Sequence, residues 1–571
     1  MASTPPVVLA SVPPSLELRE SYYSGAGLGS HCGTTDPSFL TRTGHILPAE
    51  KDLANGIFAI LQRSGLPWIG FNVLRIGYHR LKHRLPPRQL FIEVEAGKVE
   101  WDAGVGLAQK CRSQMVTLGL DVHCEVYFKL EVLEARIEAS STASPPSPSN
   151  PGAPADPFFW PIERRCNFIH SWDDALLPFT SALGQSVATN TSGHATGSVS
   201  FYVGISANSR RYNCLFSSRH ALLDDKTSES IDRVSSAGSS TGDGLKEVEL
   251  TVDHKERIAD VDDHIRALEQ LLGEPCLSHA LRIEQGLPCT ECSLNRRNKQ
   301  DFQTLKDFLE FYMRRGSDRT IGHILLAPPI ETVLAKSGTY FRRDWAAVYM
   351  DPSKTNLDDH ALPKNELCTA SDEGRKPFHR HGIMRDSLGE SPSMASEKVT
   401  IEHYLTIESL QRQLKNSRST SPLQAVKVGA GTYFTSGPLN SVPYFCNAGN
   451  NKYTTNMCIV GAYDYDDDDD EGDPKPSLLN VFSRKTDVGS LVSLFCGSEE
   501  YYYDDMKTVV AAGVLWGGNY CPGDDRHFGL SYATPLAYIL DDVKKCFAES
   551  TGAVDEAEVV LSNLTPWARS G

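Results

Sequence analysis

The amino-acid sequence predicts a mainly β protein with an α+β layer at its N-terminus and a helical hairpin inserted into the β-rich part. Short apolar segments separated by glycine turns follow Ile321. Two earlier segments instead repeat apolar residues every three or four positions, and a Ser/Pro-rich stretch divides the chain. Short strands at turn-punctuated spacing are typical of barrels and sandwiches, whereas the three-to-four repeat is typical of amphipathic helices.

Residues 1–137 are expected to form the N-terminal α+β domain. A helix over Lys51–Gly65 ends at a glycine, and a second helix is expected over Glu100–Leu118. Strands are expected at Trp68–Gly77, Leu90–Gly97 and Asp121–Glu134. Helices and strands in this order indicate a compact α+β layer, in which no residue looks catalytic.

Residues 138–157 are expected to be a linker. The stretch "ASSTASPPSPSNPGAPADP" is too poor in apolar residues to fold on its own. The remaining residues, 158–571, then form the β-rich domain. Its helical hairpin is expected at about 245–315, and its two apolar stripes should pack against each other in antiparallel fashion. The stripes consist of Ile258, Val261, Ile265, Leu268 and Leu272 on one helix, and Phe302, Leu305, Leu309 and Tyr312 on the other.

Four potential metal ligands lie in the connection between these helices. Cys276 and His279 form one pair with two residues between them, and Cys289 and Cys292 form another. Four such ligands can hold a structural zinc ion tetrahedrally. The alternative is that they are thiols at a helix turn, because no glycine or aromatic knuckle accompanies them. No other cofactor is expected.

The charge of the chain limits its partners. The 571 residues carry a net charge of −16, with a pI of about 5.5, which argues against nucleic acid or an anionic membrane as the main partner. No apolar run approaches the roughly 20 residues that span a bilayer, and the N-terminus lacks the basic start of a signal peptide. A cytoplasmic or nuclear location is therefore expected, with the 14 cysteines reduced.

Three short motifs follow one another in an informative order. His220 follows the apolar pair Leu215 and Phe216, Asp344 directly precedes the apolar segment "WAAVYM", and the turn "TDVGSLV" surrounds Val488. This order, with the later "LWGGN" and the closing helix "TPLAYILDDVKKCF", resembles the chymotrypsin-fold (trypsin-like) serine proteases, including intracellular fungal proteins of this fold. The resemblance covers roughly Pro178–Phe547 and implies a double β-barrel.

By this resemblance, His220 matches the general base and Asp344 the carboxylate that orients it. The nucleophile position falls on Val488, which has no hydroxyl or thiol and cannot form an acyl-enzyme. Thr486 and Asp487 fall at the oxyanion-hole turn. The family has glycine in place of Thr486, whose β-branched side chain restricts the backbone. Asp487 matches the aspartate that pairs with a newly cut amino terminus in zymogen-activated members, although no convincing cleavage site precedes the first barrel.

Ser490 is the alternative nucleophile. It lies two residues beyond Val488, a shift of about 6–7 Å along a strand, whereas a productive serine–histidine contact needs about 2.6–3.2 Å. The first hypothesis is therefore an inactive homologue that acts as a binding or scaffold module for a protein or peptide partner. The second is an active serine endopeptidase or hydrolase that uses His220, Asp344 and a displaced nucleophile. The third is an unrelated all-β scaffold with a helical zinc hairpin.

Overall fold

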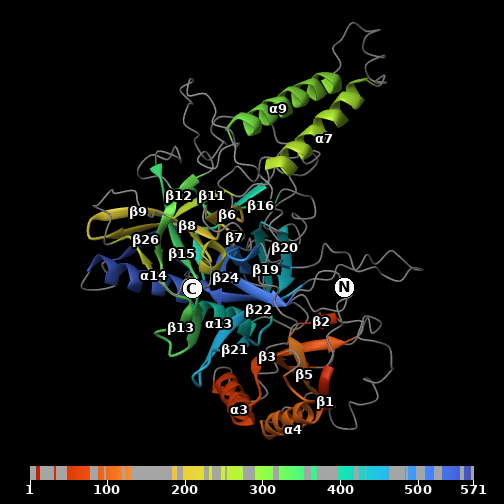
Figure 1. The fold of residues 1–571 in the computed structure, drawn as a ribbon, viewed down its shortest axis with the longest axis vertical. Coiled ribbons are helices and arrows are strands. Elements are labelled where there is room, and N and C mark those ends of the chain that lie inside the picture. The colour runs from red at the N-terminus through yellow and green to blue at the C-terminus, as the bar shows by residue number, and fades with distance from the viewer. Residues whose placement is uncertain are drawn as a thin grey trace.

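The computed structural model places a large part of the chain in defined elements (Figure 1). It describes residues 8–12, 31–33, 48–77, 88–95, 98–118, 123–129, 183–189, 197–223, 230–234, 246–250, 254–273, 290–312, 320–352, 362–369, 397–416, 423–430, 432–461, 482–483, 487–496, 508–519, 530–552 and 559–567. Most of the described elements are strands, so the prediction of a mainly β chain is confirmed.

The N-terminal layer has the predicted order of elements. These are α3 (Pro48–Ser64), β3 (Trp68–Gly77), β4 (Arg88–Glu95), α4 (Trp101–Thr117) and β5 (His123–Lys129). β4 and β5 are parallel, and the chain crosses between them through α4, as a parallel pair requires. Two short strands extend the layer: β1 (Val8–Val12) pairs with β5, and β2 (His31–Gly33) pairs with β3. The predicted boundary at 137 and the linker lie outside the described residues and stay predictions.

A first large sheet begins after the expected linker. Its strands are β6 (Ser186–Thr189), β7 (Gly197–Ser198), β8 (Phe201–Ala207), β9 (Arg210–Ser217), β10 (Ile231–Asp232), β11 (Glu247–Leu250), β12 (Thr320–Ala327), β15 (Ala346–Met350) and β26 (Val560–Ser562). β7 and β8 are successive parts of one extended segment. Because β7 pairs with β6 while β8 pairs with β9, the strand path returns to the segment where it began.

A second large sheet follows. Its strands are β18 (His403–Tyr404), β19 (Gln424–Gly429), β20 (Tyr433–Pro438), β21 (Tyr444–Asn447), β22 (Tyr453–Val460), β23 (Leu491–Cys496), β24 (Thr508–Asn519), β25 (Leu530–Pro535) and β27 (Thr565–Pro566). Its main path runs β22–β25–β24–β23–β19–β20. Just after β20, Leu439 forms a β-bridge with Ile459 of β22, which brings this path back to β22.

Smaller elements complete the fold. Two hairpins pair β13 (Glu331–Leu334) with β14 (Tyr340–Arg343), and β16 (Glu366–Thr369) with β17 (Glu397–Thr400). The further helices are α6 (Arg219–Leu222), α13 (Ile407–Asn416) and α14 (Leu536–Thr551).

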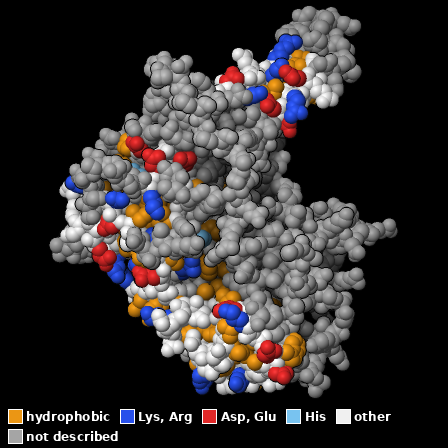
Figure 2. Space-filling model, viewed as in Figure 1, with side chains coloured by type: hydrophobic (Ala, Val, Ile, Leu, Met, Phe, Trp, Pro, Cys, Tyr) orange, Lys and Arg blue, Asp and Glu red, His pale blue; other side chains and the backbone are white. Residues whose placement is uncertain are grey.

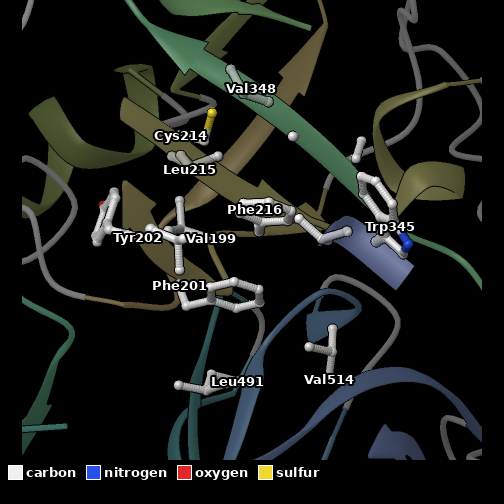
Figure 3. Close-up of a cluster of buried hydrophobic side chains, with 14 of the residues drawn as sticks. Val199, Phe201, Tyr202, Cys214, Leu215, Phe216, Trp345, Val348, Leu491 and Val514 are labelled. Atoms are coloured by element: carbon white, nitrogen blue, oxygen red, sulfur yellow. The ribbon is translucent and has the colours of Figure 1, made fainter. Parts of the chain in front are cut away.

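The two large sheets share one apolar core. Phe201 and Phe216 of the first sheet stack with their ring centroids 4.7 Å apart. They lie near Leu491 and Val514 of the second sheet, and all four side chains are buried in one cluster (Figure 3). Burial of aromatic side chains contributes strongly to core stability, so this contact fixes the two sheets relative to each other.

The N-terminal layer continues the second sheet, because β3 pairs antiparallel with β21. The interface also buries a carboxylate: Glu93 accepts hydrogen bonds from the hydroxyls of Tyr444 at 2.6 Å and Tyr532 at 3.0 Å. The rings of these two tyrosines stack with centroids 3.9 Å apart. This pairing joins segments more than 350 residues apart in the chain, and no sequence motif indicated it.

The helical hairpin consists of α7 (His254–Gly273) and α9 (Thr290–Tyr312), and it projects from the body of the molecule (Figure 1). It is inserted between β11 and β12, which pair with each other. Lys299 contacts Glu269 and Lys306 contacts Asp262, each at 2.7 Å, which sets the helices antiparallel. Of the predicted apolar stripes, Ile265 and Phe302 are buried among the described side chains.

The described surface carries a mixture of charges. Acidic and basic side chains are interspersed, including on the hairpin (Figure 2). Among the described residues, no helix is both long and apolar enough to cross a membrane.

Candidate functional site

His220 and Asp344 are brought together by the pairing of β9 with β15. In this ladder Ser217 lies opposite Ala346, so the residues just after β9 face those just before β15. The chain leaves β9 into the short helix α6, which carries His220, while Asp344 lies two residues before β15. The apolar strands that made the two motifs visible in the sequence therefore also place the two side chains side by side.

Asp344 receives two hydrogen bonds from His220. The ring Nδ1 lies 2.5 Å from Oδ2, and the backbone N–H donates to Oδ1 at 3.1 Å. Asp344 is buried, and burial by itself would raise its pKa. The charge and hydrogen bonds of His220, with a contribution from Arg342, outweigh that effect and hold the pKa of Asp344 below its usual range. The carboxylate therefore stays ionised and orients the imidazole.

The residues on either side of Asp344 anchor its segment to α14. Arg343 makes two hydrogen bonds to the buried carboxylate of Asp542, at 2.6 and 2.7 Å. The indole N–H of Trp345 donates to the same carboxylate at 2.9 Å. A bidentate arginine–carboxylate pair is strong and directional. Since Arg343 and Trp345 flank Asp344 in the chain, their contacts with Asp542 fix the backbone that carries the Asp344 carboxylate.

The turn that contains Val488 packs against the first sheet. The carbonyl of Val488 accepts a hydrogen bond from the backbone N–H of Ser198 at 2.8 Å. Gly489 has φ of +90°, and a Cβ at this position would lie 2.7 Å from both the Ser198 carbonyl and the Ser217 hydroxyl oxygen. Glycine is required here by conformation and by space. Because Ser217 ends β9 two residues before α6 begins, the turn lies beside the segment that carries His220.

Asp487 forms a buried ion pair with a residue that the sequence analysis did not single out. Its Oδ2 lies 3.1 Å from the Nζ of Lys427 on β19, and neither side chain is exposed. Thr432 donates two further hydrogen bonds to Asp487, from its backbone N–H at 3.0 Å and its hydroxyl at 2.7 Å. Burial lowers the pKa of Lys427, and the nearby Asp487 carboxylate opposes that shift. An internal ammonium group thus holds the turn.

Ser490 is fully buried behind this turn. Its backbone N–H donates to the Asp487 carbonyl at 2.9 Å, and its own carbonyl accepts from Leu515 at 3.0 Å. Among the described residues its hydroxyl has no hydrogen-bond partner. A Cβ built on Gly429 of β19 would lie 2.8 Å from this hydroxyl and would also meet the Asp487 carboxylate. The Ser490 hydroxyl therefore lies on the buried Asp487 side of the turn, against β19.

A strand edge begins beside the turn. Leu515 of β24 exchanges backbone hydrogen bonds with Gly489 and Ser490. Among the described strands, β24 pairs with β23 only as far as Val514 and with β18 only at Ala511. From Leu515 to Asn519, the described strand that pairs with β24 is β25. In an antiparallel ladder half of the backbone groups point away from a given neighbour, so some backbone groups of this stretch have no partner strand among the described residues.

Arg342 lies between Trp516 of this strand edge and the Asp344 carboxylate. The indole N–H of Trp516 donates to Asn456 at 3.1 Å, and its ring stacks on Tyr532 with centroids 5.8 Å apart. The guanidinium of Arg342 lies over the Trp516 ring, 5.1 Å from its centroid. The Nε of Arg342 is also 3.5 Å from Oδ2 of Asp344. Trp516 belongs to the "LWGGN" motif of the sequence, whereas no motif pointed to Arg342.

Several predicted site residues fall outside the described residues. These are Thr486 of the oxyanion-hole turn, and Cys276, His279 and Cys289 of the zinc hypothesis. The fourth potential ligand, Cys292, is half-buried in α9. Within the residues that the structure describes, no group of three or more potential metal ligands comes together. The zinc hypothesis stays a prediction.

Comparisons with known proteins find little similarity. No protein-family model and no curated protein matches the chain. Among solved structures it is similar to one described as a glutamic-acid-specific serine protease that uses a histidine triad in substrate binding. That pair shares 11% sequence identity over 63% of this chain and 97% of the other, with a TM-score of 0.24. The likeness is weak, so we interpret the site from its own contacts.

Proposed function

We propose that this chain is a trypsin-like double-barrel protein that has lost its nucleophile and binds extended peptides. The observation that carries the proposal is the edge of β24 from Trp516 to Asn519. It begins beside the Val488 turn, and Arg342 links its Trp516 to the Asp344 carboxylate. An exposed strand edge recognises an extended peptide through main-chain hydrogen bonds, and pockets beside it select side chains.

The two barrels of the proposal correspond to the two large sheets. Each sheet has a strand path that returns to its own beginning, through the β7–β8 segment in one and the Leu439–Ile459 bridge in the other. His220 and Asp344 belong to the first sheet, whereas Val488 precedes β23 of the second. A site divided between two barrels is what the resemblance to trypsin-like proteases implies.

The identity of residue 488 is the main argument against peptide cleavage. Valine offers no group that can attack a carbonyl carbon. The hydroxyl of Ser490, two residues on, has no exposed surface and lies against β19. A substrate carbonyl would have to enter the buried Asp487 cluster to reach it. Both observations favour binding without hydrolysis.

Hydrolysis remains the second candidate because the His220–Asp344 pair has the geometry of a general base and its orienting carboxylate. The pair would retain that role if another hydroxyl reached His220. A fluorophosphonate probe that labels the natural protein at any serine would favour this candidate.

The test of peptide binding uses Gly517 of β24. A Cβ built on this residue meets no described atom within 4 Å, so Gly517→Val should be tolerated by the fold. The new side chain would project from a face of β24 beside this edge and would obstruct the side chains of a bound peptide. We expect random decapeptides displayed on phage to be enriched by the natural protein. Peptides recovered in this way should bind Gly517→Val at least tenfold more weakly, as isothermal titration would measure.

Gly106→Ala in α4 is the matched control, because its added Cβ also meets no described atom within 4 Å but lies in the N-terminal layer. It should leave peptide affinity unchanged. Failure to enrich any peptide, or equal affinity of the natural protein and Gly517→Val, would contradict the proposal.

A further inference from the structure

We propose that the peptide bound along β24 carries an acidic side chain beside Trp516, and that Arg342 selects it. This inference rests on the proposed function and specifies its ligand. It follows from the position of one guanidinium group, from how that group is held, and from which of its nitrogen atoms remain available.

The guanidinium group of Arg342 is buried at its Nε atom, but part of the side chain is exposed to solvent. Its Nε is buried and faces Asp344, while the guanidinium carbon lies over the ring of Trp516. The side chain nevertheless keeps 36% of its surface exposed. Within the described part of the chain, Asp344 is its one ionic partner and no hydrogen bond to a guanidinium nitrogen is found. The fork of terminal N–H groups is thus fixed in direction and accessible.

Asp344 does not satisfy this fork. Both of its oxygens accept hydrogen bonds from His220, at 2.5 and 3.1 Å, and it meets Arg342 only through Nε at 3.5 Å. A planar guanidinium binds a carboxylate best through two parallel hydrogen bonds. The remaining donors of Arg342 therefore suit a second carboxylate arriving from solvent. Within the length of a bound peptide, the side chain of an Asp or Glu supplies such a carboxylate.

A second cation, Lys452, lies beside β14. Tyr340 is two residues before Arg342, so both side chains leave the same face of β14. The ammonium group of Lys452 lies 4.9 Å from the centroid of the Tyr340 ring. The acidic neighbours Glu331 and Asp542 are instead engaged by Arg343, on the opposite face of β14. Although the chain as a whole is anionic, two cations lie beside this face of β14. Arg342 comes from β14 itself, and Lys452 comes from the turn between β21 and β22 of the second sheet.

The experiment compares the full-length protein with Arg342→Gln in the same decapeptide selection. We expect Asp and Glu to be enriched at one peptide position by the natural protein but not by the variant. A recovered peptide is then synthesised with Glu or Gln at that position. The natural protein should bind the Glu peptide about five- to tenfold more tightly, the range expected for a partly exposed charge-assisted pair. Arg342→Gln should bind both peptides equally.

Lys545→Gln, which removes an exposed positive charge from α14, is the control and should keep the preference for Glu. If Arg342→Gln does not fold, the two peptides can still be compared on the natural protein in low and high salt. Equal affinity for the Glu and Gln peptides would overturn this inference and leave peptide binding intact. Recovery of no peptide at all would instead overturn the proposed function.

Discussion

The site contains two buried aspartates with contrasting surroundings. Asp344 is paired with His220, whose side chain is 24% exposed, and with Arg342, whose side chain is 36% exposed. Asp487 is neutralised by Lys427, and neither of those side chains has any exposed surface. The first carboxylate thus holds groups that a ligand can reach, whereas the second holds a turn in place. Both carboxylates are buried, so burial does not distinguish a residue that positions a binding group from one that holds the fold. The two aspartates differ in whether the side chains they are paired with reach the surface.

Removal of the buried Lys427 ammonium group should have the largest effect on stability. Lys427→Met would leave the Asp487 carboxylate buried without a counter-charge, which costs about 3–5 kcal/mol of unfolding free energy. Chemical denaturation would measure the loss. In the double variant with Asp487→Asn no charge remains, so a large part of the stability should return. A loss below about 1 kcal/mol in the single variant would contradict the structural role assigned to Asp487.

Asp344→Asn should have a smaller effect that depends on pH. The variant loses a charge-assisted hydrogen bond, worth about 1–3 kcal/mol at pH 7. Because the folded state lowers the pKa of Asp344, this stabilisation is complete above the ordinary value of 3.8 and is lost as the pH falls below it. Urea denaturation should therefore show a smaller difference between the natural protein and the variant at pH 3 than at pH 7. If the difference in stability grew as the pH fell, the pKa of Asp344 would not be lowered in the folded state.

Val488→Ser should change stability least and chemistry most. The substitution replaces two methyl groups by one hydroxyl in a residue that is 9% exposed, at a cost of about 1–2 kcal/mol. We expect the variant, and not the natural protein, to react with a fluorophosphonate probe, because it places a hydroxyl beside the segment that carries His220. Val488→Ser combined with His220→Ala is the control and should not react. Labelling of the natural protein, located by mass spectrometry, would point to hydrolysis.

The motifs and the structure agree best where strands determine position. His220 and Asp344 could be paired from the sequence because each lies at the end of an apolar segment, and adjacent strands bring such ends together. Lys427 had a weaker signal: a charged residue between Val426 and Val428 in an otherwise apolar strand. The buried ion pair could not be inferred, because its partner is 60 residues away in the sequence and depends on how two strands pack.

Arg342 was missed for a related reason. Its role depends on Trp516, which lies on a different sheet, and on the bulge at which the ladder between β24 and β25 shifts register. A bulge re-aims one side chain without leaving a local pattern in the sequence. The N-terminal layer was recognised as a set of elements, but the pairing of Phe71 with Phe445 that joins it to the second sheet has no counterpart in spacing or composition.

The pairing of β3 with β21 also limits how freely recombination can exchange the N-terminal layer. Glu93 holds the hydroxyl of Tyr532, whose ring supports Trp516 at the proposed peptide edge. A gene fragment for the two large sheets alone would remove β3 from the side of β21 and the Glu93 carboxylate from two buried tyrosine hydroxyls. The N-terminal layer is therefore not a module that recombination can exchange freely. It has to be passed on together with the residues it supports, because a change at Glu93 would reach Trp516 of the proposed peptide edge through Tyr532.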